Sequence, residues 1–314
     1  MDLTFTAEQE ELRTQARAFL AEHPEPSWRE LAELGWTGVS IDEADGGAGL
    51  SFIEEAVLFE EFGRALTPGP YFSSVALTLP ALPGDLQAGV AVGDASWTLA
   101  LGPLVPGLDA VDRIATVGGD GVFELEGAER ELLETTDESR PLGVVRGGEP
   151  GRRLADATVL DTIRPRALAA LALEACGVAR RALEYAVDHV TTREQFGKPI
   201  GTYQAVSHPL ADAYAHVELG RSLALWAAWC VAVGDEQAAT AASAAKAYAS
   251  EAAVAVCETA IQVHGGIGFT WEHVLHRLYK RALWIESFFG SGTRLRADIA
   301  ATLLDEPVLA QKGA

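Results

Sequence analysis

The chain has 314 residues, of which 48% are hydrophobic and 22% charged, a composition typical of a globular protein rather than a disordered one. Its formal net charge of -21 argues against nucleic acid and anionic membranes as partners. The cysteines Cys176, Cys230 and Cys257 lie singly in apolar helical sequence, so we expect buried free thiols and neither disulfides nor a metal site. No charged-then-apolar segment opens the chain and no uninterrupted apolar run could span a bilayer, so we expect a cytoplasmic protein.

Residues 1–85 predict a helical N-terminal domain. Three capping boxes, a Ser or Thr followed three residues later by Gln or Glu, mark helix starts at Thr6, Ser27 and Ser51. We expect helices over residues 6–22, 27–35 and 51–64, and a fourth over 72–81. Trp36–Ile41 reads as an extended passage that leads into a glycine loop.

Residues 86–161 predict a small β domain, because glycine and β-branched residues replace the helical periodicity there. Gly119–Gly121 supplies a hairpin turn, and Asp137–Pro141 reads as a solvated polar turn. The expected strands are Trp97–Leu101, Ile114–Val117, Val122–Leu125 and Thr158–Leu160.

Residues 162–314 predict a four-helix bundle. Alanine is dense, as in bundles whose helices approach closely, and residues 306–314 are expected to form a frayed tail. The expected helices are Pro165–Thr191, Thr202–Val233, Glu236–Val263 and Glu272–Leu304. The fold class is therefore mainly α with a small β domain.

Two segments in this C-terminal half go beyond ordinary connectors. The first, residues 193–204, contains Arg193 and Phe196 among turn-forming glycines and a proline. A guanidinium suits a phosphate, and a neighbouring aromatic suits a ring-shaped part of the same ligand. The second, residues 261–270, has three glycines within four residues, where a helix end needs only one. Each segment alone has a simpler interpretation: Arg193 as a surface ion-pair former, Phe196 as an interface or core residue, and His264 as a structural histidine.

Together, the pattern Arg-x-x-Phe-Gly-x-Pro-Ile-x-x-x-Gln and the later Gln-x-x-Gly-Gly-x-Gly resemble the C-terminal domain of the acyl-CoA dehydrogenases. In that family these segments hold the adenine and pyrophosphate end of an FAD that the neighbouring subunit mainly binds. The resemblance extends to the helical N-terminal segment. It implies that FAD is shared across a subunit interface and contacts Arg193, Phe196, Gln204, Gln262, Gly265 and Gly266, with Gln195, Ile200 and Tyr203 as further candidates.

The family removes a proton from the α-carbon and a hydride from the β-carbon of an acyl-CoA, using a carboxylate as the base and the flavin as the hydride acceptor. By resemblance the base falls at Gly290 or, in some members, at Ala167, and neither is a carboxylate. Glu286 lies about one helical turn away and is the alternative candidate, although a glutamate on the helix surface is its simpler interpretation. Glu174 is expected to form a salt bridge or an interface pair. The family's flavin-cradling segments are also missing from the short β domain.

This combination is similar to the small subunits of actinobacterial α2β2 acyl-CoA dehydrogenases, which act on CoA esters of steroid side chains. The resemblance implies a longer catalytic partner chain and electron-transfer flavoprotein as the electron acceptor, with this chain inactive alone. Two alternatives stay open. One is a stand-alone homo-oligomeric acyl-CoA dehydrogenase with Glu286 as its base, and the other is a flavin-free structural or acyl-CoA-binding protein.

Overall fold

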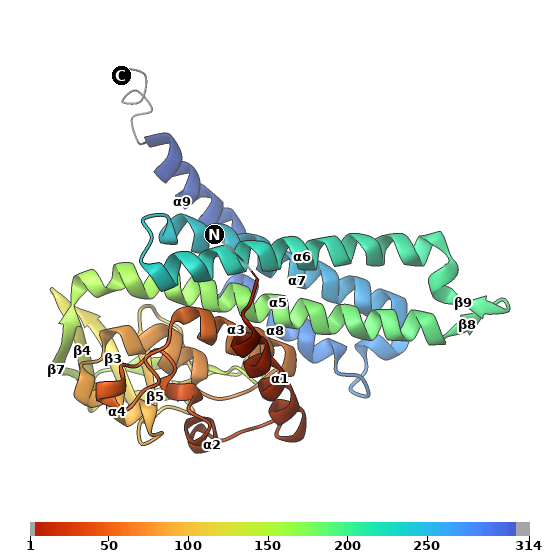
Figure 1. Ribbon diagram of the computed structural model, residues 1–314. Helices are drawn as coiled ribbons and strands as arrows, with labels where there is room; N and C mark the ends of the chain where they lie inside the picture. The colour runs from red at the N-terminus through yellow and green to blue at the C-terminus, as the bar shows by residue number, and fades with distance from the viewer. Residues whose placement is uncertain (1–3, 306–314) are drawn as a thin grey trace.

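A computed structural model describes residues 4–305, so the tail expected at 306–314 lies outside the described part. Three long helices run side by side through the molecule: α5 (Leu160–Thr192), α6 (Gln204–Val233) and α7 (Ala238–His264). Figure 1 shows the N-terminal helices and the sheets packed along one part of these helices, while the hairpin β8–β9 stands at their other end. The expected fold class, mainly α with a small β region, is confirmed.

The N-terminal helices are α1 (Ala7–Glu22), α2 (Trp28–Glu33), α3 (Phe52–Ala65) and α4 (Gly84–Ala91). All three predicted capping boxes are present, with both reciprocal hydrogen bonds formed in each. The expected extended passage at Trp36–Ile41 is wrong, because Trp36–Gly38 forms a 3-10 turn after the left-handed Gly35.

The expected helix over residues 72–81 is a π-helix, Phe72–Thr78, followed by a 3-10 turn, Leu79–Ala81. Its wide turn is tied to the sheet. The Ser74 hydroxyl donates to the Trp97 carbonyl and accepts from the Trp97 N–H at 2.9 Å. The backbone of the first strand is thus hydrogen-bonded directly to a side chain of this helix.

The middle region contains two small sheets. One has the order β1 (Trp97–Ala100), β3 (Arg113–Gly118), β4 (Gly121–Glu126) and β7 (Glu149–Asp156), with only the β1–β3 pair parallel. The other has the order β2 (Val105–Pro106), β6 (Leu142–Arg146) and β5 (Glu129–Leu132). The strand expected at Thr158–Leu160 is wrong: β7 ends earlier, a 3-10 turn covers Ala157–Val159, and α5 begins at Leu160.

The bundle is completed by α8 (Leu275–Ser287), and α9 (Gly292–Asp305) follows it. The single helix expected over Glu272–Leu304 is therefore wrong. It is broken at Phe288–Ser291, where Phe289 has φ 64° and Gly290 has φ 112°, values that an α-helix does not accommodate. This break, the inner turn (Phe288–Ser291), contains the position at which the resemblance expects a catalytic base.

The helices meet at small residues. α3 crosses α5 so closely that a Cβ on Gly177 would lie 1.9 Å from the Glu60 carbonyl oxygen, and one on Gly63 would lie 2.1 Å from the Glu174 carbonyl oxygen.

All three cysteines are buried and free, as expected. By length and composition, the stretch Ala238–Phe269 passes a test for a membrane-spanning helix, which a core helix also passes; 44% of its most apolar window is buried inside this molecule.

Candidate functional site

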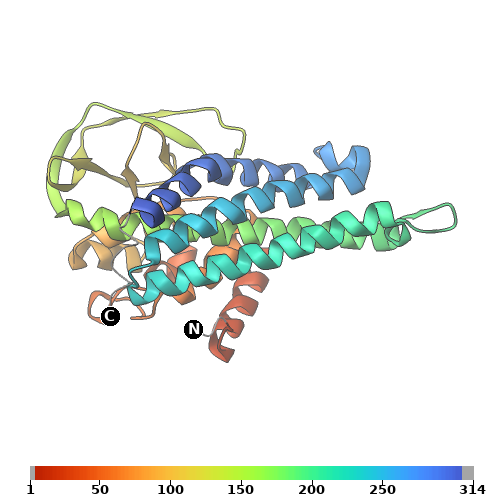
Figure 2. The same ribbon diagram turned by 90° about the horizontal axis from the view of Figure 1, so that it is seen from above.

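The first predicted segment forms an exposed hairpin at the end of α5 and α6. β8 (Glu194–Gln195) pairs with β9 (Lys198–Pro199), and Phe196 and Gly197 form the two-residue turn with φ values of 53° and 80°. The left-handed conformation is unfavourable for a phenylalanine, and this one is 94% exposed. Figure 2 shows the hairpin projecting beyond the bundle, away from the sheets. An aromatic side chain fully in solvent on a strained backbone is typical of a residue that contacts a ligand or another chain.

The hairpin is held by its own residues. The Tyr203 hydroxyl donates to the Gln195 carbonyl at 3.1 Å, and Lys198 Nζ lies 4.2 Å from the centre of the Tyr203 ring. Ile200 packs against the main apolar core, and its N–H donates to the Arg193 carbonyl at 2.8 Å. Tyr203 and Ile200 therefore shape the hairpin in addition to being candidates for cofactor contact.

Arg193 follows the last residue of α5 and is exposed. Among residues 4–305 its guanidinium makes no ion pair or hydrogen bond, whereas many other arginines of the chain are paired with carboxylates. The exposed Gln204 and Gln262 side chains likewise have no partner within the described part, and the Gln195 amide donates only to the adjacent Glu194 carbonyl. Arg193, Gln204 and Gln262 are therefore donors without an acceptor among the described residues.

The second segment lies at the same end of the bundle. Gly265 caps α7 with φ 65°, and a 3-10 turn follows over Gly265–Phe269. A Cβ added at Gly265 or Gly266 would meet no atom within 4 Å, so the backbone of this turn is open to an incoming group. The ring of His264 stacks on that of His189 at 4.2 Å, which brings the two predicted segments into one region. We call residues 193–204 and 262–268 the distal end.

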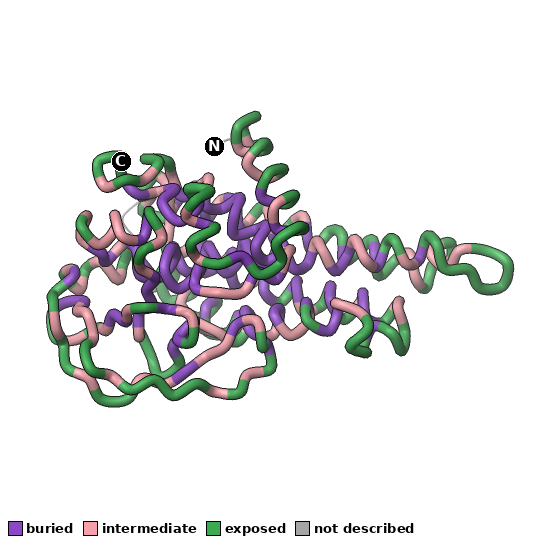
Figure 3. The backbone as a smooth tube through the Cα atoms, turned by 90° about the horizontal axis from the view of Figure 1, so that it is seen from below, coloured by how far each residue is buried: buried purple, intermediate pink, exposed green. Residues whose placement is uncertain are grey.

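The groups at the distal end fit the adenine and diphosphate part of FAD. A free guanidinium suits a diphosphate, the side-chain-free backbone of Gly265–Gly266 leaves room for one to approach, and exposed amides and an aromatic ring suit a purine or ribose. Figure 3 shows that this end is mostly exposed, whereas buried residues concentrate where the bundle meets the N-terminal helices. The distal end offers these contacts outward and does not enclose a cofactor by itself.

The inner turn offers a different chemistry. Gly290 takes the first expected base position, and Ala167, the second, is fully buried on α5. The carbonyls of Glu286 and Gly290 accept hydrogen bonds from Lys246 Nζ at 2.9 and 2.5 Å. Burial lowers the pKa of Lys246 to about 8, although Glu286 and Glu251 act in the opposite direction. A buried ammonium thus fixes the backbone of the turn.

Beside the inner turn lies an apolar cavity of about 330 Å³. Trp284 and Phe288 stack at 4.5 Å along one side of it, and none of its lining residues carries a charge. Glu286 does not line this cavity. Its lining residues are Leu77, Leu99, Leu101, Gly102, Pro103, Leu104, Pro106, Leu142, Trp284, Ser287, Phe288 and Phe289.

Asp161 is a carboxylate that no sequence motif singles out. It is exposed in the first turn of α5 and lines an adjoining cavity together with Phe289 and Arg164. Its separation of more than a hundred residues from the inner turn hides this proximity in the sequence. Asp161 is a further candidate base for tests of activity.

Behind the cavity lies a buried group of four charges. Arg281 Nε donates to Asp137 Oδ2 at 2.5 Å, and an Arg140 N–H donates to Glu174 Oε1 at 2.7 Å. The expectation that Asp137–Pro141 is solvated is wrong, since Asp137 and Arg140 are each only 4% exposed. Burial opposes ionisation of Asp137, but Arg281, Ser139 and Arg140 outweigh it and hold the pKa of this carboxyl below its ordinary value. Glu174 is a salt-bridge partner, as expected.

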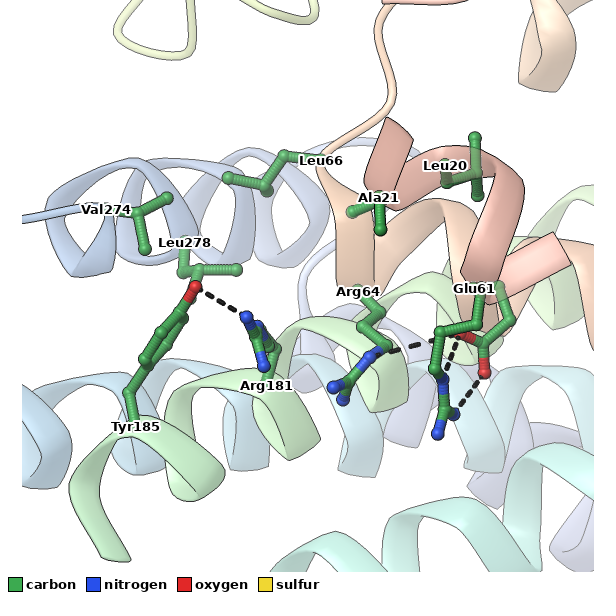
Figure 4. Close-up of a pocket in the computed structure, with 11 residues that line it drawn as sticks. Leu20, Ala21, Glu61, Arg64, Leu66, Arg181, Tyr185, Val274 and Leu278 are labelled. Carbon is green, nitrogen blue, oxygen red and sulfur yellow. Dashed lines mark hydrogen bonds and ion pairs between the residues drawn. The ribbon is translucent and has the colours of Figure 1, made fainter. Parts of the chain in front are cut away.

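A third cavity, about 210 Å³, lies between α1, α3, α5 and α8. Figure 4 shows apolar side chains such as Leu66 and Leu278 on one side of it and arginines on the other. Its arginines are already engaged: Arg17 and Arg64 with glutamates, and Arg181 with Glu184 and the Tyr185 hydroxyl. We therefore assign it no ligand.

Comparison with known proteins gives the class of this chain. Residues 6–83 match the family described as "Acyl-CoA dehydrogenase, N-terminal domain", and residues 165–304 match "Acyl-CoA dehydrogenase, C-terminal domain". The chain therefore belongs to the acyl-CoA dehydrogenase family.

The chain is 34% identical over 268 residues to the acyl-CoA dehydrogenase IpdE2 of Mycobacterium tuberculosis. The matched region covers 83% of this chain and 81% of that protein. Among solved structures it is similar to the Tcur3481-Tcur3483 steroid ACAD G363A variant, with 29% identity and a TM-score of 0.86 over 95% of this chain and 98% of that one. It is also similar to a chain of the ChsE4-ChsE5 complex from Mycobacterium tuberculosis, with 25% identity, a TM-score of 0.86, and coverage of 98% and 100%.

Proposed function

We propose that this chain is the non-catalytic subunit of a heteromeric, flavin-dependent acyl-CoA dehydrogenase. Its role is to contact an FAD that a longer partner chain mainly holds. The observation that carries the proposal is a contrast between two regions. Both expected base positions lack a carboxylate, since they hold Gly290 and Ala167, whereas the distal end keeps its exposed donors. Family membership supports the reaction class, oxidation of a CH–CH bond.

In this proposal the chain's own residues bind and orient. FAD supplies hydride acceptance, and the partner supplies the carboxylate that removes the α-proton. Arg193 neutralises diphosphate charge, the Gly265–Gly266 backbone lets the same group approach closely because neither residue has a side chain, and Phe196 covers an apolar face of the dinucleotide. Gln204 and Gln262 add amide donors. The hairpin, held by Tyr203 and Ile200, fixes the position of Phe196.

Two similar structures support a heteromeric assembly, since one is the ChsE4-ChsE5 complex and the other is a Tcur3481-Tcur3483 steroid ACAD. We propose by analogy an α2β2 heterotetramer that acts on an acyl-CoA thioester, with a steroid side-chain CoA ester as the first substrate to test. Electron-transfer flavoprotein is the proposed electron acceptor and the cytoplasm the proposed compartment. Nucleic acid and membrane are not proposed partners, given the net charge of -21.

The first experiment is purification of the assembly from the native host through a tag on this chain, followed by measurement of its mass and flavin content. We expect one FAD per pair of unlike chains. A yellow homo-oligomer of this chain alone would contradict the proposal and favour the stand-alone enzyme. Glu286→Gln and Asp161→Asn would then identify its base. An assembly without flavin would favour a structural or acyl-CoA-binding role.

The second experiment tests the distal end directly. Arg193→Ala should lower the flavin content of the purified assembly severalfold while its subunit composition and circular dichroism stay unchanged, because the change removes the free guanidinium. Arg29→Ala is the matched control, since Arg29 is an exposed arginine paired with Asp94 in the N-terminal region. Unchanged flavin content in Arg193→Ala would remove Arg193 from the site.

A further inference from the structure

Three histidines from three segments meet at the distal end. The ring of His264, the last residue of α7, lies 4.2 Å from that of His189 on α5 and 4.6 Å from that of His273 before α8. Tyr185 closes the group with its ring 5.2 Å from His273. We call His189, His264 and His273 the histidine stack. Within residues 4–305 no group of side chains has the arrangement of a metal site, so these histidines need another explanation.

Hydrogen bonds limit where the stack can take up a proton. His264 Nδ1 lies 2.8 Å from the Ala260 carbonyl oxygen, which can only accept, so Nδ1 carries a hydrogen and Nε2 remains open. His273 Nδ1 accepts from the Leu275 N–H at 3.2 Å, which keeps that nitrogen unprotonated. The described residues give the His189 ring no hydrogen-bond partner. A new proton therefore goes to His189 or to His264 Nε2.

The groups that shift the pKa values of His189 and His273 all lower them. Burial, then His264, then Arg193 lower the pKa of His189. Burial, then His264, His189 and His276 lower the pKa of His273. His276 on α8 faces Lys280 and Arg277, with Glu138 as its one opposing charge. No carboxylate is among the groups that shift the pKa of His189 or His273, although Asp188 and Glu272 are their neighbours in the sequence.

The stack adjoins both parts of the candidate site through the chain. His189 is one helical turn before Arg193, whose N–H donates to the His189 carbonyl at 2.9 Å. His264 immediately precedes Gly265, the first residue of the open turn. An anion seated between Arg193 and Gly265–Gly266 would therefore lie next to both histidines.

We propose that the histidine stack belongs to the anion site of the distal end and takes up one proton when a dinucleotide diphosphate binds there. The inference rests on the proposed function and adds that binding of the cofactor is coupled to uptake of a proton. The proton comes from solvent and goes to His189 or to His264 Nε2. The negative charge of the diphosphate offsets the positive charge of Arg193, which otherwise disfavours a protonated His189. One proton per three rings suits the stack, since two adjacent imidazolium ions would repel each other.

The test is the pH dependence of FAD binding to the flavin-stripped assembly, measured by titration between pH 6.0 and 8.0. Uptake of one proton makes the Kd rise with pH by up to about tenfold per pH unit. The double variant His189→Phe/His264→Phe keeps stacked rings but cannot take up the proton, so its Kd should depend less steeply on pH than the wild-type Kd. His23→Phe is the matched control, because His23 also stacks on an aromatic ring, Phe19, at 4.4 Å, in the N-terminal helix region. A double variant with the wild-type slope overturns the inference.

A calorimetric titration of the wild-type assembly with FAD in two buffers of different ionisation enthalpy keeps the test independent of the variants. Net proton uptake near pH 6.5 is expected, and its absence overturns the inference. The outcomes separate the two proposals. If Arg193→Ala leaves flavin content unchanged, the proposed site itself fails. If Arg193→Ala lowers flavin content but no proton is taken up, only the role of the histidine stack fails.

Discussion

The distal end and the inner turn lie on the same bundle and are built in opposite ways. At the distal end, Arg193 is unpaired within the described residues and Phe196 is strained and 94% exposed. Around the inner turn, Arg281 is fully buried against Asp137, and Lys246 satisfies two backbone carbonyls. One region leaves its polar and aromatic groups available, and the other uses its own groups internally.

The difference between paired, buried charges and unpaired, exposed donors indicates which part of the bundle is available for binding. Buried charges are stable only when paired, so the charged groups around the inner turn are committed to the fold. Exposed donors at the distal end add little to the fold and are free to bind. We therefore expect substitutions near the inner turn to change stability, and substitutions at the distal end to change binding.

The largest effect should come from Arg281→Met. This change leaves the carboxylate of Asp137 buried without its main partner, and breaking a buried ion pair costs about 3–5 kcal/mol. The free energy of unfolding from urea denaturation is the measurement. Arg296→Met is the control, since its ion pair with Glu251 is exposed and should contribute less than about 1 kcal/mol. Equal effects of the two substitutions would remove the contrast between buried and exposed charges.

The next effect concerns Lys246 and pH. Its pKa falls from 10.5 to about 8 on folding, mainly through burial. Below pH 8 both states carry the proton, and between pH 8 and 10.5 only the unfolded state keeps it. This group therefore makes the free energy of unfolding rise with pH across that window, by an amount on the order of 3 kcal/mol. Urea denaturation at several pH values should show this rise in the wild type and a smaller one in Lys246→Met. Parallel pH profiles would contradict the low pKa.

Sequence reasoning succeeded where the cause is local. The capping boxes at Thr6, Ser27 and Ser51 each lie within four residues, and all three formed. It failed where the cause is distant. Asp137 was expected in solvent because its partner Arg281 lies 144 residues away, and Asp161 was overlooked for the same reason.

The same limit applies to the candidate site. The two distal segments were selected from the sequence through a family pattern, and the structure places them at one end of the bundle. The histidine stack that joins them belongs to no short motif: His189, His264 and His273 come from separate segments. The helix expected over Glu272–Leu304 ran through the inner turn, although the resemblance placed a turn at Phe288–Thr293 and Gly290 and Gly292 are unfavourable in a helix interior.

A smaller effect is expected from Gly177→Ala at the crossing of α3 and α5. The new Cβ would approach the Glu60 carbonyl oxygen to 1.9 Å, so the helices must move apart. Overpacking of this kind costs roughly 1–3 kcal/mol. Gly102→Ala is the control, since a Cβ there meets no atom within 4 Å and its φ is not positive. Thermal unfolding of the two variants measures the difference, and equal melting temperatures would show that the crossing is not tightly packed.

The smallest change in stability, and the sharpest test of the comparison, is Phe196→Gly. Glycine relieves the left-handed strain at φ 53°, but it also loses more conformational entropy on folding, so the two terms nearly cancel to within ~0.5 kcal/mol. Binding should respond differently, because the exposed ring is removed, and flavin content of the assembly should fall. Phe196→Ala is the matched variant: it also lacks the ring but keeps the strain, so it should lower flavin content equally and destabilise the hairpin slightly more. If Phe196→Gly lost stability and kept its flavin, Phe196 would belong to the fold, and the distal end would not differ from the inner turn in the way described.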